Sequence, residues 1–102
     1  MLKDGDKKEY VELPDVTEFM NTQSHEVRNE YDVIVSRLAR DGHLNMPCGE
    51  KIKGKNLFAI RIIQAGNIRV FYVYGVKDRI IGIHGYVKKT QQIPNHELNY
   101  AV

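Results

Sequence analysis

Three strand-like segments between residues 57 and 87, separated by tight turns, constrain the fold most strongly. LFAIRII (57–63), IRVFYVY (68–74) and RIIGIHGYV (79–87) are rich in the β-branched and aromatic residues that favour strands. The sequences AGN (65–67) and GVKD (75–78) have the composition of hairpin turns. The segments therefore predict an antiparallel meander. Because these strands are nearly apolar on both sides, helices must cover at least one face of the sheet.

The residues before the meander predict the helices that cover it. A helix begins after Ser24, a favourable N-cap, and ends at Gly42, which can adopt the left-handed conformation. Its apolar stripe consists of Val27, Tyr31, Ile34, Val35 and Leu38. A short helix over VTEFMN (16–21) and a short strand over KEYVEL (8–13) precede it, and the strand joins an edge of the meander.

The remaining segments predict irregular structure. Residues 43–56 contain several Gly, Asn and Pro residues and predict a loop, and a short helical tail can begin at Asn95. The predicted fold class is α+β: two N-terminal helices packed on a twisted, mainly antiparallel four-stranded sheet. The 102 residues predict a single domain spanning 1–102.

Composition excludes several classes of protein. No apolar run approaches the roughly 20 residues of a membrane helix, and the N-terminus lacks a signal-type apolar segment. The single cysteine, Cys48, permits no internal disulfide, so a cytoplasmic location is expected. Cys48 has no metal-ligand spacing to His25, His43 or His96, and no phosphate-binding glycine motif is present. We therefore predict neither a metal nor a cofactor.

The charges divide sharply along the chain. Residues 1–50 contain six Lys or Arg and eleven Asp or Glu, whereas residues 51–102 contain nine Lys or Arg and two Asp or Glu. Such asymmetry indicates a polyanionic partner for the basic half.

Two of these basic residues, Arg61 and Arg69, lie inside apolar strands. A buried guanidinium without a partner costs several kcal/mol, so each must reach solvent, an acidic group or a ligand. One possibility is an ion pair with helix carboxylates such as Glu26 or Glu30. The other is a phosphate site, because the guanidinium fork suits phosphate oxygens.

The C-terminal part of the meander adds further groups to the predicted site. His84, Tyr86 and Lys88 share strand parity, and Lys89 follows directly. Sheet faces with basic and aromatic residues commonly bind single-stranded RNA by phosphate contacts and base stacking.

The ordered segments LFAIR, IRVFY and HGYVKKT, followed by P-x-x-E-L-x-x-A, resemble the HigB-like, phage-derived branch of the RelE/ParE toxin superfamily. The resemblance covers about residues 11–101 and is most specific over 57–97. These are the toxins of type II toxin–antitoxin modules.

The resemblance implies a RelE-like fold and a metal-free endoribonuclease that cleaves mRNA, usually on the ribosome. It also implies inhibition by an antitoxin of the helix-turn-helix type. The motif positions give the catalytic candidates Arg61, Arg69, Lys88, Lys89 and Tyr86. The candidates for RNA binding are the loop lysines Lys51, Lys53 and Lys55, together with His84, which is also an alternative acid or base.

Two positions depart from the family pattern. The acid commonly found two residues before the first arginine is replaced by Ala59, and the usual Phe before the lysine pair is Tyr86. Two other functions therefore stay open: a ParE-like toxin that inhibits DNA gyrase, and a phage-derived nucleic-acid-binding regulator without catalysis.

Overall fold

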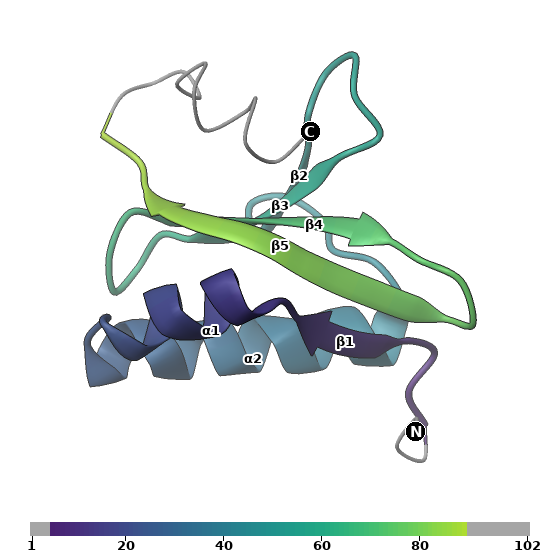
Figure 1. Ribbon diagram of the computed structural model, residues 1–102, viewed down its shortest axis with the longest axis horizontal. Coiled ribbons are helices and arrows are strands. Elements are labelled where there is room, and N and C mark those ends of the chain that lie inside the picture. Colours follow the sequence, from purple (N-terminus) through teal and green to yellow (C-terminus); the bar gives the residue numbers. More distant parts are fainter. Residues whose placement is uncertain (1–4, 90–102) are drawn as a thin grey trace.

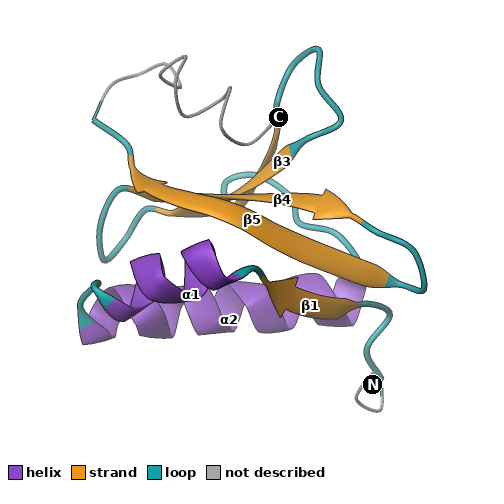
Figure 2. Ribbon diagram, in the orientation of Figure 1, coloured by secondary structure: helices purple, strands orange, loops and turns teal. Residues whose placement is uncertain are grey.

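The computed structural model describes residues 5–89, in which two helices pack on one side of a single sheet (Figure 1). The elements are β1 (Glu9–Glu12), α1 (Pro14–Asn21), α2 (His25–Asp41), β2 (Gly49–Lys51), β3 (Phe58–Ile62), β4 (Ile68–Tyr74) and β5 (Arg79–Val87). Figure 2 shows both helices on the same side of the sheet. The predicted α+β class is confirmed, whereas the helical tail predicted from Asn95 lies outside the described residues. Neither α1 nor α2 has the length and apolarity that a membrane-crossing helix needs.

The sheet has five strands in the order β1–β5–β4–β3–β2, so the prediction of four strands is wrong. The additional strand is β2, which pairs with β3 inside the segment predicted to be a loop. This edge strand is only three residues long and has no run of alternating apolar residues that could reveal it. The first strand does join an edge of the meander, and it pairs with β5 in parallel.

The helix α2 begins and ends as predicted. The Ser24 hydroxyl accepts a hydrogen bond from the backbone N–H of Val27, and Gly42 ends the helix with a φ of 81°. The buried side chains of this helix face the core, where they pack against the helix-facing residues of β3 and β4. These strand residues are Ile60, Ile62, Ile68, Val70 and Tyr72.

Close contacts fix the helical layer against β5 and β1. A Cβ atom on Gly85 would lie 2.6 Å from Cδ2 of Phe19, so glycine allows α1 to approach β5 closely. Between β1 and α2, the hydroxyl groups of Tyr10 and Tyr31 are 2.7 Å apart, and Tyr31 donates to the Glu12 carboxylate at 2.6 Å. These contacts hold the helices to one face.

Glu30 of α2 binds the turn between β3 and β4. Its carboxylate accepts hydrogen bonds from the backbone N–H groups of Ile63 (3.0 Å), Gln64 (3.2 Å) and Ala65 (2.7 Å). Three donors on a charged acceptor form strong hydrogen bonds, because ionised partners strengthen each bond. The helix therefore holds the turn that joins the two arginine-bearing strands.

We expect Glu30→Ala to lower the free energy of unfolding by about 2–3 kcal/mol, because three backbone donors lose a charged acceptor. Glu30→Gln should lower the free energy of unfolding by less, since the amide retains one accepting oxygen. Denaturant unfolding measures both changes. The matched control is Asp32→Asn on the exposed side of α2, which should change stability by less than about 0.5 kcal/mol. An effect of Glu30→Ala no larger than the control would contradict this role.

Candidate functional site

The face of the sheet opposite the helices carries two cross-strand rows that contain several of the predicted site residues. In the first row, Arg61 of β3 lies directly opposite Arg69 of β4, and Arg69 lies opposite Tyr86 of β5. The second row, one pair further along the strands, consists of Glu50, Ala59, Phe71 and His84. We call these two rows the open-face site. Side chains in such rows are close enough to act on one ligand, since facing residues are about 5 Å apart.

Arg69 is only 3% exposed, although it carries a charge. Its Nη1 donates to Oδ1 of Asn67 at 3.3 Å and to the carbonyl of Ile68 at 3.1 Å. Burial lowers the pKa of Arg69, and the positive charge of Arg61 lowers it further, whereas Glu50 and Tyr86 act in the opposite direction. The site is therefore short of negative charge around this guanidinium.

Arg61 has weaker contacts than Arg69. Its Nη1 lies 3.8 Å from the sulfur of Met46. The Nε atoms of both arginines are buried, and neither has a hydrogen-bond partner within residues 5–89. The positive charge of Arg61 disfavours the charged form of Arg69, which lowers the pKa of Arg69. An anionic ligand would relieve both the repulsion and the unsatisfied donors.

The possible ion pairs with helix carboxylates are not formed in the described structure. Among the ion pairs of residues 5–89, none includes Arg61 or Arg69. Glu30, one of the proposed partners, binds the turn instead. Within residues 5–89, no helix carboxylate therefore neutralises either arginine.

Aromatic rings pack beside the arginines. Phe71 and His84 are 6.3 Å apart between ring centroids, and Phe71 and Tyr86 are 5.5 Å apart. Tyr86 is 5% exposed and belongs to a second apolar cluster on this face, whereas His84 is half-buried. The ring of Tyr86 is thus held by packing, with its hydroxyl on the row of the arginines.

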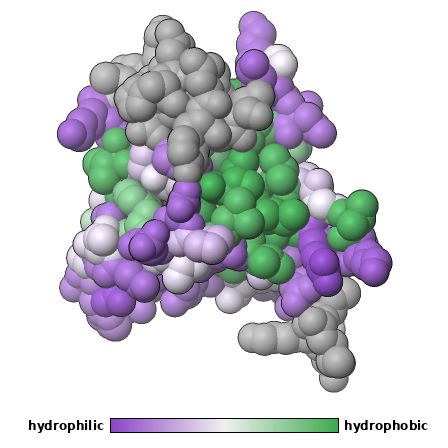
Figure 3. Space-filling view, viewed as in Figure 1, coloured by the Kyte–Doolittle hydropathy of each residue, from purple (hydrophilic) through white to green (hydrophobic). Residues whose placement is uncertain are grey.

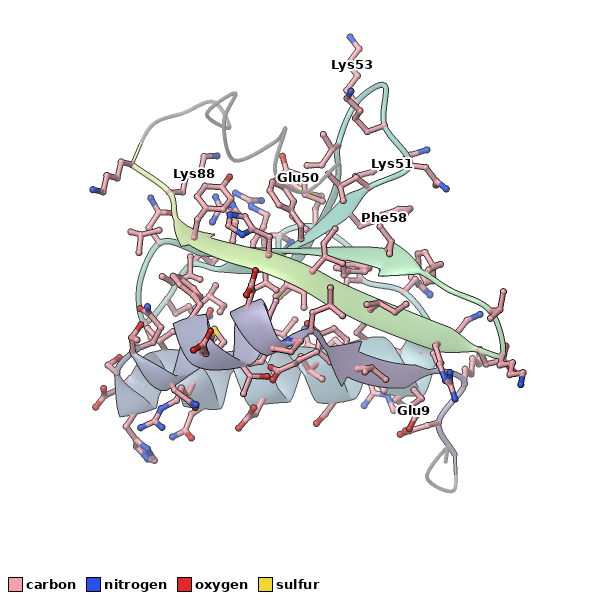
Figure 4. The ribbon with its side chains drawn as sticks, in the orientation of Figure 1. Glu9, Glu50, Lys51, Lys53, Phe58 and Lys88 are labelled. Atoms are coloured by element: carbon pink, nitrogen blue, oxygen red, sulfur yellow. The ribbon has the colours of Figure 1, made fainter. Side chains whose placement is uncertain are left out.

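The predicted lysines fall into three groups. Lys88 and Lys89 follow the end of β5, and Asn67 connects them to the site: it donates through Nδ2 to the carbonyl of Lys88 at 2.7 Å and accepts from Arg69. In Figure 4, Lys88 and Lys53 lie on the side of the sheet away from the helices, Lys88 beyond β5 and Lys53 at the tip of the loop between β2 and β3. Lys55 is exposed in the same loop.

Lys51 does not join the open-face site. It pairs with Phe58, whose ring packs against the helix-facing core, and its Nζ lies 6.0 Å from the centroid of that ring. Alternate residues of a strand point to opposite faces, so Lys51 and Glu50 diverge. The structure therefore separates Lys51 from the arginines.

The predicted site residues lie towards one end of the open face. Towards the other end, Val11, Ile81 and Val73 form an apolar row across β1, β5 and β4. Beyond this row, Arg79 of β5 forms an ion pair with Glu9 of β1. In the view of Figure 3, an apolar area lies near the middle of the molecule. The predicted residues of the strands are thus concentrated where β5 ends.

Two polar residues at or beside this site were not predicted from the sequence: Glu50 of the second row, and Asn67, which accepts a hydrogen bond from Arg69. Glu50 lies directly opposite Ala59, the position where the family pattern has an acid, so a neighbouring strand supplies the carboxylate on the same face. No periodic signal marks β2, and only its pairing with β3 shows where Glu50 points. Asn67 is visible in the sequence only as a turn residue.

Comparison with protein families identifies the family of this chain. The family model described as phage derived protein Gp49-like (DUF891) matches residues 18–102. Comparison with curated protein sequences finds no match.

Three solved structures are similar to this chain. A chain of the E. coli RelBE toxin–antitoxin complex has a TM-score of 0.67 and 9% identity, covering 81% of this chain and 99% of its own length. A chain of the RelB–RelE complex from Methanococcus jannaschii has a TM-score of 0.61 and 20% identity, with coverages of 76% and 88%. The YoeB/ParE toxin from Agrobacterium tumefaciens has a TM-score of 0.59 and 17% identity, with coverages of 79% and 99%.

The family model covers most of the chain, and the structural matches extend over about four fifths of it. The family model thus confirms the predicted phage-derived family, and the structural matches confirm the predicted RelE-like fold. The chain belongs to the phage-derived Gp49-like family and has the fold of RelE and YoeB/ParE toxins.

Proposed function

We propose that this protein is the toxin of a type II toxin–antitoxin module and that it cleaves mRNA as a metal-free endoribonuclease. The observation that carries the proposal is the direct pairing of Arg61 with Arg69 on the open face, with a buried Nε on each. Buried charged donors without a partner call for an explanation, and a phosphodiester supplies the missing acceptors.

The proposed reaction is attack of a ribose 2′-oxygen on the adjacent phosphorus, with transfer of the 2′-hydroxyl proton to a general base. The P–O5′ bond breaks, giving a 2′,3′-cyclic phosphate and a free 5′-hydroxyl group. Negative charge grows on the non-bridging oxygens in the transition state, and Arg61 and Arg69 stabilise it with charges that do not titrate near neutral pH. Tyr86, which lies opposite Arg69, donates a proton to the leaving O5′.

The lysines guide and hold the RNA in this proposal. Lys88 and Lys89 contact phosphates next to the cleaved one, because Asn67 ties their segment to Arg69. Lys53 and Lys55 contact RNA or the ribosome from the exposed loop. The half-buried ring of His84 contacts a base at the edge of the site. Lys51 contributes only through the electrostatic attraction of the loop, since it lies on the other face.

The proposed partners are an antitoxin of the helix-turn-helix type, mRNA and the ribosome, all met in the cytoplasm. Support for the antitoxin comes from the similar structures, two of which are toxin–antitoxin complexes. An antitoxin that neutralises this chain would need to cover or distort the open-face site.

We expect Arg69→Ala to reduce the rate of mRNA cleavage at least about 100-fold, since removing one transition-state donor costs this much in other enzymes. Arg69→Lys should restore little of the cleavage rate, because a single ammonium group lacks the forked pair of donors of a guanidinium. The measurement is mapping of 5′ ends after incubation of a defined mRNA with purified protein, with and without ribosomes.

Arg79→Ala is the matched control for Arg69→Ala. Arg79 is also a strand arginine, but it is exposed and lies 3.5 Å from the Glu9 carboxylate, away from the site. Its loss should leave cleavage unchanged, and thermal unfolding should show that all variants are folded. Cleavage by a folded Arg69→Ala protein at the full rate would overturn the assignment. Intact RNA together with inhibited DNA gyrase would instead indicate a ParE-like toxin, and RNA binding without cleavage would indicate a regulator.

RNA affinity should fall steeply with salt. If four cations contact phosphates of a single strand, the logarithm of the binding constant falls with a slope of about −3 against the logarithm of salt concentration. The affinity then decreases roughly 50-fold between 50 and 200 mM salt. Fluorescence anisotropy with a labelled 2′-deoxy-substituted oligonucleotide measures this without cleavage. A slope near zero would contradict phosphate binding by these residues.

A further inference from the structure

Asn67 makes three hydrogen bonds, although it is an exposed residue at the end of the turn between β3 and β4. Its backbone carbonyl accepts from the N–H of Lys88 at 2.7 Å. In its side chain, Nδ2 donates to the carbonyl of Lys88 at 2.7 Å, and Oδ1 accepts from Nη1 of Arg69 at 3.3 Å. One carboxamide therefore joins two basic residues that different segments of the chain supply.

The contacts with Lys88 hold the chain in place beyond the end of β5. Val87 is the last residue of β5 and lies opposite Ile68, the first residue of β4. Lys88 then bonds to Asn67 through both its N–H and its carbonyl. Because both polar groups of this backbone unit are bound, the half-buried side chain of Lys88 starts from a defined position next to Arg69. In Figure 4, the side chain of Lys88 lies on the side of the sheet away from the helices.

The contact with Arg69 orients a guanidinium without removing its charge. Within residues 5–89, Nη1 of this buried arginine donates to Oδ1 of Asn67 and to the carbonyl of Ile68. Both acceptors are neutral, so they bind the donor and leave the positive charge uncompensated. An aspartate at position 67 would instead place a carboxylate next to the guanidinium and form an ion pair. The uncharged amide therefore holds Arg69 and leaves its charge for a phosphate.

The geometry of the turn alone does not account for asparagine at position 67. Asparagine is common in turns partly because it tolerates a positive φ. Among the described non-glycine residues, positive φ angles occur at Lys77 and Asp78, and Asn67 is not one of them. The side-chain contacts with Lys88 and Arg69 are the feature that requires asparagine here, because its amide carries both a donor and a neutral acceptor.

We propose that Asn67 is a positioning residue that makes Arg69 and Lys88 bind RNA as one unit, a role that rests on the proposed function. Asn67 acts through these two cations and contacts no RNA itself. Because Lys88 is held before the RNA arrives, less conformational entropy is lost when its ammonium group binds a phosphate. The amide thus sets the distance between two phosphate contacts, one at Arg69 in the sheet and one at Lys88 beyond it.

A double-mutant cycle between Asn67→Ala and Lys88→Ala tests this coupling. We expect Lys88→Ala to weaken binding of a labelled 2′-deoxy-substituted oligonucleotide about 10-fold in the unaltered chain. In the Asn67→Ala protein, where the lysine is no longer held, the same change should weaken binding less than about threefold. The matched control is Asn29→Ala, which removes another exposed asparagine with a side-chain contact, to His25 of α2, and should leave the effect of Lys88→Ala at about 10-fold. Fluorescence anisotropy measures these affinities, and thermal unfolding shows whether each variant is folded.

Asn67→Asp separates positioning from a merely structural contribution. The carboxylate keeps the contact with Arg69 and strengthens it, so the guanidinium stays in place. It also neutralises one cation of the site, and RNA binding should weaken for that reason. The slope of the logarithm of the binding constant against the logarithm of salt concentration should become less steep by about 0.7. Asn67→Ala leaves the charge of Arg69 in place and should change this slope less.

The outcomes distinguish the role of Asn67 from the proposed function. Additive losses in the cycle would overturn the role of Asn67, while Arg69→Ala still tests the arginines. An Asn67→Asp protein with the RNA affinity and salt slope of the unaltered chain would overturn it as well, and so would losses that disappear once all variants are compared fully folded. If the unaltered chain neither binds nor cuts RNA, the proposed function fails, and the role of Asn67 fails with it.

Discussion

The pairing of Arg61 with Arg69 depends on the register of the β3–β4 hairpin. In a strand pair, a slip of one residue moves every side chain of that strand to the other face. Such a slip would bury a guanidinium among Ile60, Ile62 and the apolar side of α2, and would turn core residues to solvent. Packing of the core therefore specifies the register strongly. The same register fixes the positions of Arg61 and Arg69 on the opposite face.

Glu30 adds a second constraint on the same hairpin. The turn over 63–67 has backbone N–H groups that no strand partner satisfies, and the α2 carboxylate accepts three of them. Glu30 was one expected ion-pair partner of the arginines. Instead, it binds the turn between the two strands that carry them. Within residues 5–89, the two arginines on one face therefore have no ion-pair partner, while the acidic helices pack on the other face. Burying the two arginines costs desolvation energy, which RNA binding would offset under the proposed function.

The features that the sequence predicts correctly are those with a local signal. Ser24 and Gly42 are the N- and C-terminal caps of α2, because capping chemistry acts within one turn. The β4 and β5 segments are runs of seven and nine residues rich in β-branched and aromatic side chains. The pairing of Arg61 with Arg69 on the open face could also be expected, because alternate strand residues share a face and a short turn joins the two strands. Glu50 could not be found in this way, because β2 has three residues and its orientation depends entirely on pairing with β3. The sequence could not place Lys51 on one side of the sheet for the same reason, because alternating lysines in an expected loop have no defined face without the register.

The charge asymmetry of the sequence becomes an asymmetry of the two sides of the sheet. Six acidic residues lie in the two helices: Asp15, Glu18, Glu26, Glu30, Asp32 and Asp41. The strand arginines lie on the other side, so a polyanion meets repulsion from the helical layer and attraction at the open face. Under the proposed function, a long-range field of this kind orients RNA before contact. Glu50 is the exception, an acidic residue on the same face of the sheet as the two arginines.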